Sequence, residues 1–182
     1  MRPALLSAAV LALSTFAVPA LAQTPETAGQ AAGAAMFDFC LPLFGPGPMH
    51  PDRLSATASM ANLTAAPAGA RPVGLERAQL SLLAPSPPDA MVLVFWVADP
   101  GVCQILILGS AGAGGDLVAA MPQLGWTLQQ QAVPTSPDTA ADVFTGQPRG
   151  YDSELLVVAN KWISEAEPGG SVRMILNVMR SQ

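Results

Sequence analysis

Two long apolar runs on either side of a short turn constrain the fold of this chain more than any other feature. Residues 91–98 and 102–109 are rich in Val, Ile, Leu and aromatic side chains, and Asp99-Pro100-Gly101 separates them. Such runs around a Pro-Gly turn predict an antiparallel β-hairpin. The first run is apolar at nearly every position, so we expect a central strand that is covered on both faces. Other segments must supply that cover.

The N-terminus has the pattern of a secretory signal peptide. Met1-Arg2 is a short basic start, residues 4–17 are uncharged and apolar, and Ala20-Leu21-Ala22 offers a small-x-small cleavage site. We therefore expect residues 1–22 to be removed during export to the periplasm or the outside medium, with no stable membrane span left after cleavage. The single lysine beside seven arginines, with abundant Ala, Gly and Pro, favours a bacterial source.

The rest of the chain has the size of one domain and is acidic. Residues 23–33 are small and polar, and we expect a flexible mature N-terminus that becomes helical towards its end. Residues 34–182 are then a single domain. The whole chain has 8 basic and 13 acidic residues and a formal net charge of −5. This acidity, without any basic run, argues against nucleic acid as a partner.

The two cysteines, Cys40 and Cys103, predict a disulfide bond. Disulfides form and persist in oxidising compartments, to which the signal peptide assigns this chain. Neither cysteine belongs to a C-x-x-C motif, and the one histidine, His50, has no evident relation to either of them. We favour the disulfide over a reactive thiol and over two buried free thiols.

The segments around the hairpin predict a mixed α+β domain. Met36, Cys40 and Leu43 recur at helical spacing, which predicts a helix over residues 31–43 that brings Cys40 towards the sheet. The order of elements lacks β-α-β alternation, so we predict an antiparallel sheet of about five strands, with helices packed on one face and one disulfide. The other predicted elements are helices over 52–63 and 114–124, strands over 126–133, 150–163 and 170–179, and ambiguous segments at 75–83 and 142–145.

A glycine-rich loop follows the hairpin, but its spacing does not fit a nucleotide site. Residues 108–117 lie between a strand and a helix, where such loops hold phosphate. The spacing fits neither G-x-G-x-x-G nor a Walker loop, and Asp116 places a negative charge where phosphate would sit. Ser110 also lacks the G-x-S-x-G context of a nucleophile elbow, because Leu108 stands two positions before it. We expect a mobile, inert loop and no cofactor.

The remaining polar groups do not predict a metal or catalytic site. One histidine cannot build the usual zinc site, and Asp52 is better placed to cap the helix that follows it. Two acid pairs resemble glycosidase carboxylates only in composition, and we assign no catalytic residue to them. These pairs are Asp152 with Glu154 and Glu165 with Glu167.

Two functions from different classes remain open. Trp96, Trp126 and Trp162 all fall in predicted strands, where they could line a sheet face that binds an apolar ligand, although we favour core packing for them. The first function is therefore non-enzymatic binding of a protein or a small apolar ligand, through the sheet face or the glycine-rich loop. The alternative is a periplasmic hydrolase that uses Asp152 and Glu154. An apolar groove or a flat self-complementary surface favours the first function, and a deep pocket joining two carboxylates favours the second.

Overall fold

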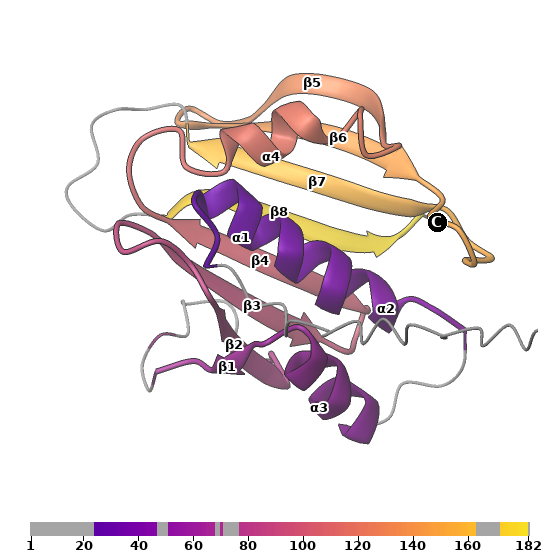
Figure 1. The fold of residues 1–182 in the computed structure, drawn as a ribbon. Helices are drawn as coiled ribbons and strands as arrows, with labels where there is room; N and C mark the ends of the chain where they lie inside the picture. Colours follow the sequence, from indigo (N-terminus) through magenta and orange to yellow (C-terminus); the bar gives the residue numbers. More distant parts are fainter. Residues whose placement is uncertain (1–23, 47–50, 68–69, 71–76, 163–171, 182) are drawn as a thin grey trace, which may run out of the picture.

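The computed structural model describes residues 24–46, 51–67, 70, 77–162 and 172–181. Within this part of the chain, eight strands form one antiparallel sheet in the order β1-β2-β3-β4-β8-β7-β6-β5 (Figure 1). The fold class is α+β as predicted, but the expected count of about five strands is wrong, because the shorter and less apolar strands lack a clear alternating pattern. The strands are β1 Thr64–Ala65, β2 Leu80–Ala84, β3 Met91–Val97, β4 Val102–Leu108, β5 Thr127–Ser136, β6 Thr139–Gly146, β7 Leu155–Trp162 and β8 Val172–Arg180.

The predicted hairpin is confirmed as β3 and β4, near the middle of the sheet. The two strands pair antiparallel from Met91 opposite Leu108 to Val97 opposite Val102. Five consecutive residues of β3, from Val92 to Trp96, are buried. This burial requires cover on both faces, as the continuous apolar run predicts.

One helical run precedes the sheet. It consists of α1 (Ala28–Ala34), a π-helix η1 (Ala35–Cys40) and α2 (Leu41–Leu43), which follow one another directly. Thr27 begins it, because the Thr27 hydroxyl accepts the backbone N–H of Gln30 at 3.0 Å. The helix therefore begins at Ala28, three residues before the predicted start at residue 31, and most residues of α1 are buried.

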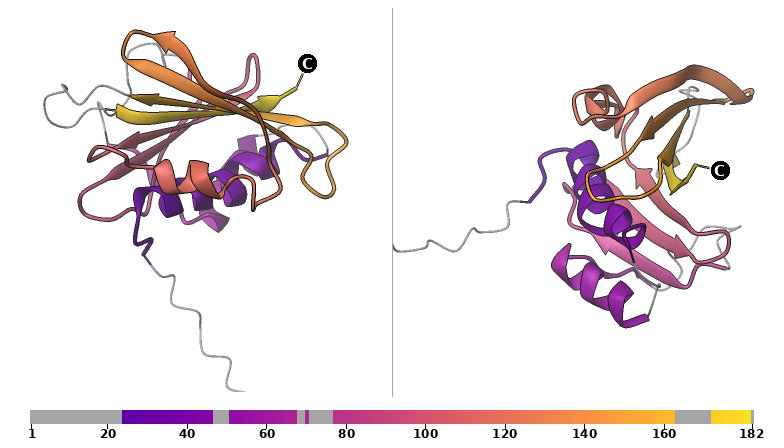
Figure 2. Two further views of the ribbon diagram at one scale, coloured as in Figure 1. Left: turned by 90° about the horizontal axis from the view of Figure 1, so that it is seen from above. Right: turned by 90° about the vertical axis from the view of Figure 1, so that its right-hand side faces the viewer.

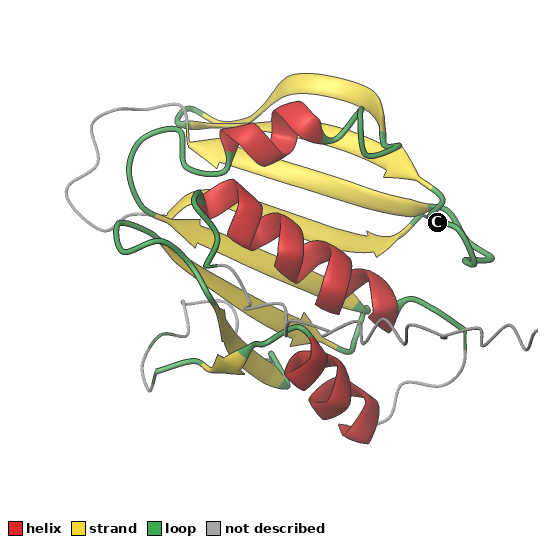
Figure 3. Ribbon diagram, viewed as in Figure 1, coloured by secondary structure: helices red, strands yellow, loops and turns green. Residues whose placement is uncertain are grey.

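Two shorter helices complete the helical layer. The predicted second helix is α3 (Pro51–Met60), and the predicted third helix is α4 (Gly115–Ala120). All the helices lie on one side of the twisted sheet, as Figures 2 and 3 show from different directions. Among the described residues, none of the helices has the length and apolarity needed to cross a membrane.

The predicted disulfide between Cys40 and Cys103 is confirmed. Both cysteines are fully buried, and their Cα atoms lie 5.6 Å apart, within the usual range for a disulfide. The bond joins the C-terminal end of η1 to β4. It therefore ties the helical layer to the central hairpin inside the larger hydrophobic core, which the helices and the facing side of the sheet form together.

The opposite face of the sheet carries a smaller core. Leu93, Phe95 and Leu106 pack there with Ala78, which lies just before β2. In β8, Met174, Leu176 and Val178 belong to the larger core, because alternate residues of a strand lie on the same face of the sheet. Val172 does not join them: the register between β4 and β8 shifts after Ile107 opposite Met174, and Val172 packs against the smaller core instead.

The outer strands are longer than the sequence pattern suggests. The strand predicted over residues 126–133 extends to Ser136, so Pro134 lies inside β5, and the turn to β6 contains only Pro137 and Asp138. β5 is the last strand of the sheet, and such an edge strand tolerates proline because one of its sides has no hydrogen-bonding neighbour.

Candidate functional site

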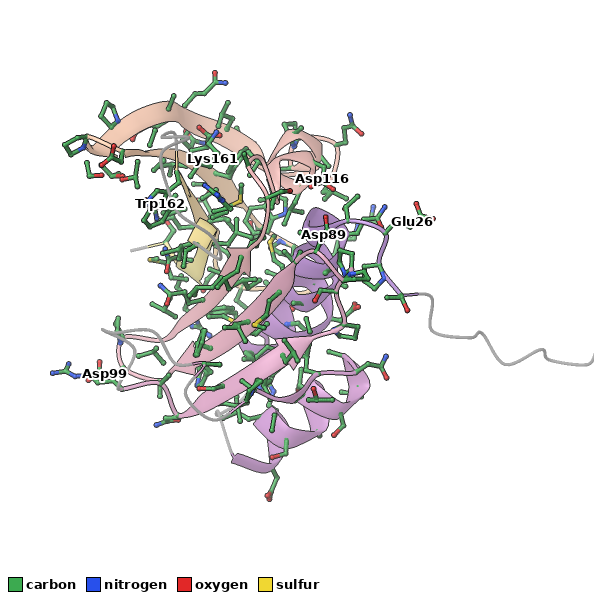
Figure 4. The ribbon with its side chains drawn as sticks, turned by 90° about the vertical axis from the view of Figure 1, so that its left-hand side faces the viewer. Glu26, Asp89, Asp99, Asp116, Lys161 and Trp162 are labelled. Carbon is green, nitrogen blue, oxygen red and sulfur yellow. A yellow bond between two sulfur atoms is a disulfide. The ribbon has the colours of Figure 1, made fainter. Side chains whose placement is uncertain are left out.

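The three tryptophans do not lie together on one exposed face. Trp96 and Trp126 are each 4% exposed and belong to the larger core beneath the helices. The Trp96 ring packs edge-on against Phe44, with ring centroids 5.7 Å apart. Trp162 is half-buried at the end of β7, near Lys161 in Figure 4, and pairs with Thr139 of β6. The aromatic ligand face that we considered is therefore not assembled, although Trp126 borders a different pocket.

The glycine-rich loop borders an acidic hollow. A pocket of about 310 Å³ lies between this loop and the start of α1, and its lining includes Glu26, Asp89 and Asp116, which Figure 4 places on one side of the molecule. Asp116 is already engaged, because the Thr27 hydroxyl donates to its Oδ2 at 2.6 Å. Three carboxyl groups around one hollow disfavour phosphate there.

Close packing explains why glycines occupy two positions around this hollow. A Cβ atom on Gly29 would lie 1.8 Å from Asp116 Oδ1, so the glycine lets α1 and α4 approach closely. Gly114 has a φ of +87° and would place a Cβ atom 2.5 Å from Ile107 Cδ1. Ser110 is exposed at the loop surface. Gly29 and Gly114 therefore have a packing role.

The carboxylate pairs gain no support from the geometry. Asp152 and Glu154 are both exposed before β7, and neither lines the acidic hollow or the apolar pocket beside Trp126. Asp52 lies in the first turn of α3. His50, Glu165 and Glu167 lie outside the described residues. Among the described residues, no group of three or more His, Cys, Asp or Glu side chains is placed to hold a metal ion.

A different pocket, which we call the Trp126 pocket, is mostly apolar. It has a volume of about 290 Å³ and lies where β5 begins and β6 ends. The helical run supplies one wall, the connection from α4 to β5 supplies the second, and the segment after β6 supplies the third. The lining residues are Phe37, Leu41, Leu124, Gly125, Trp126, Gly146, Gln147, Pro148 and Arg149.

Local packing around Trp126 shapes this pocket. The backbone N–H of Trp126 donates to the Met121 carbonyl at 3.1 Å, which fixes the start of β5 against the end of α4. A Cβ atom on Gly146 would lie 2.8 Å from the Trp126 ring, so the missing side chain leaves room for the indole. Leu124 is 48% exposed at the rim. The buried indole and the exposed leucine together give the pocket an apolar wall that solvent can reach.

The segment after β6 is held in a defined turn. The Gln147 side chain donates to the Tyr151 carbonyl at 2.9 Å, and the backbone N–H of Tyr151 donates to the Pro148 carbonyl at 3.2 Å. Burial raises the pKa of the Tyr151 hydroxyl above its ordinary value of 10.0, and the nearby Arg53 guanidinium partly offsets that rise. These contacts close the turn that carries Arg149.

Arg149 is the one ionisable side chain among the described residues that line the Trp126 pocket. It is exposed, and within the described part of the chain it takes part in no hydrogen bond or ion pair. Three other arginines donate to backbone carbonyls: Arg53 to Pro42 and Pro46, Arg173 to Gly109, and Arg180 to Phe44. The Arg149 guanidinium is therefore available to a ligand.

The sequence patterns missed this pocket. The helices predicted over residues 31–43 and 114–124 include Phe37, Leu41 and Leu124, but no sequence pattern connects these residues with Arg149. No family model matches this chain, and the searches of curated proteins and of solved structures found no match either.

Proposed function

We propose that this protein is an exported, non-enzymatic bacterial domain that binds a small apolar ligand in the Trp126 pocket. The supporting observation is a concave pocket of about 290 Å³, whose lining is mostly apolar and contains one charged side chain. Binding sites for small molecules typically have this composition: apolar walls with a few polar groups that orient the ligand. The signal-peptide pattern of residues 1–22 supports export, and the Cys40–Cys103 disulfide suits a periplasmic or extracellular location.

The pocket's size favours a small molecule over a protein segment. If each heavy atom takes about 30 Å³, the share of one water molecule in the liquid, the pocket holds roughly ten heavy atoms. Each buried CH₂ group contributes about 0.8 kcal/mol, so an eight-carbon chain could bind with a Kd on the order of 1 mM or tighter. The hydrolase alternative lacks a comparable site, because Asp152 and Glu154 are exposed outside this pocket.

The test uses the mature protein and 1-octanol as a neutral apolar probe. Protein recovered from a periplasmic extract should have the mass of a chain that begins at Gln23. On titration with 1-octanol, the indole N–H resonance of Trp126 should shift in a saturable way. The resonances of Trp96 and Trp162 should change little, because neither residue lines the pocket.

A pair of variants locates the binding site. Leu124→Asn places a polar group at the rim and should weaken octanol binding by about fivefold, since part of the apolar contact is lost. Met60→Asn is the matched control, because Met60 is 74% exposed on α3 and lies outside the pocket. The proposal fails if octanol does not bind saturably, or if the two variants change its affinity equally.

A further inference from the structure

Arg149 gives the Trp126 pocket a charge opposite to that of the protein as a whole. The chain has a formal net charge of −5, whereas the other residues of the lining are uncharged. A guanidinium has five N–H donors in a planar fork that matches the two oxygens of a carboxylate. The positive group at the rim and the apolar wall behind it are complementary to a ligand with an anionic head and an apolar tail.

We infer that the ligand of the Trp126 pocket is a small amphiphilic monocarboxylate, with its carboxylate on Arg149 and its hydrocarbon chain against Trp126 and Leu124. This inference rests on the proposed function, since it names the ligand class of the same pocket. One guanidinium balances the charge of one carboxylate, whereas a phosphate dianion would keep an uncompensated charge. The volume suits a chain of about eight carbons, at about 30 Å³ for each heavy atom.

The test compares three probes that share an eight-carbon chain and differ in the head group: octanoate, 1-octanol and octylammonium. Their affinities for the mature protein are measured by calorimetry at about 0.01 M ionic strength and again in about 0.5 M salt, because the Debye length falls from about 30 Å to about 4 Å between these conditions. We expect octanoate to bind about two- to fivefold more tightly than octanol, which is the upper part of the range for an ion pair with an exposed side chain. Salt should reduce the affinity of octanoate and leave that of octanol nearly unchanged. Octylammonium should bind most weakly, because Arg149 repels it.

Arg149→Gln removes the charge and should lower the ratio of octanoate affinity to octanol affinity to about one. Arg77→Gln is the matched control: Arg77 is also exposed, and its replacement changes the net charge equally but outside the pocket. It should leave the ratio of octanoate to octanol affinity as in the wild type. Both variants alter exposed side chains, and an unchanged melting temperature would verify that they fold.

The outcomes separate this inference from the function on which it rests. Octanoate and octanol binding equally well to the wild type would overturn the inference. An equal effect of Arg149→Gln and Arg77→Gln on octanoate would overturn it as well. In both cases, octanol binding that shifts the Trp126 resonance would leave the proposed function in place. If neither probe binds saturably, both proposals are wrong.

Discussion

The central hairpin, β3–β4, and the outer hairpin, β5–β6, are stabilised in different ways. The central hairpin is buried on both faces and carries the disulfide to the helical run. In the outer hairpin, all ten residues of β5 are exposed, and only β6 contributes to the buried interior. Apolar burial therefore stabilises the middle of the sheet, whereas its outer margin depends on local polar contacts and turn geometry.

The outer hairpin is irregular, and polar contacts hold its two strands together. The register between β5 and β6 shifts in three places, and Ala132 has a φ of +50°. The Asp142 carboxylate accepts the Ala132 backbone N–H at 2.8 Å and forms an ion pair with Lys161. β5 has no charged residue, so irregular pairing and Pro134 are the features that keep this edge from pairing with another chain.

The largest expected contrast is between a core residue of the central hairpin and an exposed residue of the outer hairpin. Phe95→Ala in β3 should lower the free energy of unfolding by about 3–5 kcal/mol, because it leaves a cavity where the ring is fully buried. Val133→Ala in β5 should change it by less than about 0.5 kcal/mol, because Val133 is 37% exposed. Urea unfolding of both variants measures the difference. Similar losses in the two variants would contradict the distinction between the hairpins.

The disulfide gives the second largest effect. Replacing both Cys40 and Cys103 by Ala should lower the free energy of unfolding by about 2–5 kcal/mol, the usual cost of losing a native bridge in a small secreted domain. The bond closes a segment with a sequence separation of 63, so its loss leaves the unfolded chain much freer. Dithiothreitol should lower the melting temperature of the wild type and leave that of the double variant unchanged. The prediction is wrong if the wild type melts at the same temperature with and without reductant.

The difference between the central and the outer hairpin also determines which parts of the fold could be predicted from the sequence. The central hairpin was predictable because its apolar runs and Pro-Gly turn are strong local patterns, and the disulfide because two cysteines allow one pairing. β6 was ambiguous because Ala140 and Ala141 give no alternation of large apolar and polar residues. The Trp126 pocket could not be predicted from sequence patterns for another reason. Its walls come from segments that are separate in the sequence, and its shape depends on Gly146 leaving space for the indole.

The π-helix was also hidden from the sequence. Ala35–Cys40 has residues that an α-helix would accept equally well, and the stripe of Met36, Cys40 and Leu43 fits ordinary helical spacing. The structure also buries Phe39, which that stripe omits. Phe39 lies four residues after the buried Ala35, and Cys40 lies four residues after the buried Met36, so both belong to the side of the helical run that faces the core.

Asp142 offers a smaller and more local test of the outer hairpin. Asp142→Ala leaves the Ala132 N–H and the Lys161 ammonium without their partner, and should lower the free energy of unfolding by about 1–3 kcal/mol. Asp138→Ala is the control, because Asp138 is an exposed carboxylate in the neighbouring turn. Its effect should stay within about 0.5 kcal/mol. If the two variants are equally stable, the Asp142 contacts do not stabilise the outer hairpin.

The smallest expected effect concerns Tyr151, in the connection between the outer hairpin and β7. In the folded protein, burial raises the pKa of the Tyr151 hydroxyl above its ordinary value of 10.0. The folded state therefore holds the hydroxyl proton more strongly than the unfolded state, and this contribution to stability is complete below pH 10 and is lost as the pH rises through the folded-state pKa. Tyr151→Phe should consequently lose less stability than the wild type between neutral pH and pH values above 10.

The chain has one tyrosine, so the absorbance of tyrosinate reports on Tyr151 alone. In native protein the midpoint of this titration should lie above 10.0, and in concentrated urea it should return to 10.0, because unfolding exposes the hydroxyl to water. A common midpoint in the two conditions would mean that Tyr151 is as hydrated in the native protein as in the unfolded chain. The connection would then be loosely packed, and the lack of burial that marks β5 would extend to the turn that carries Arg149.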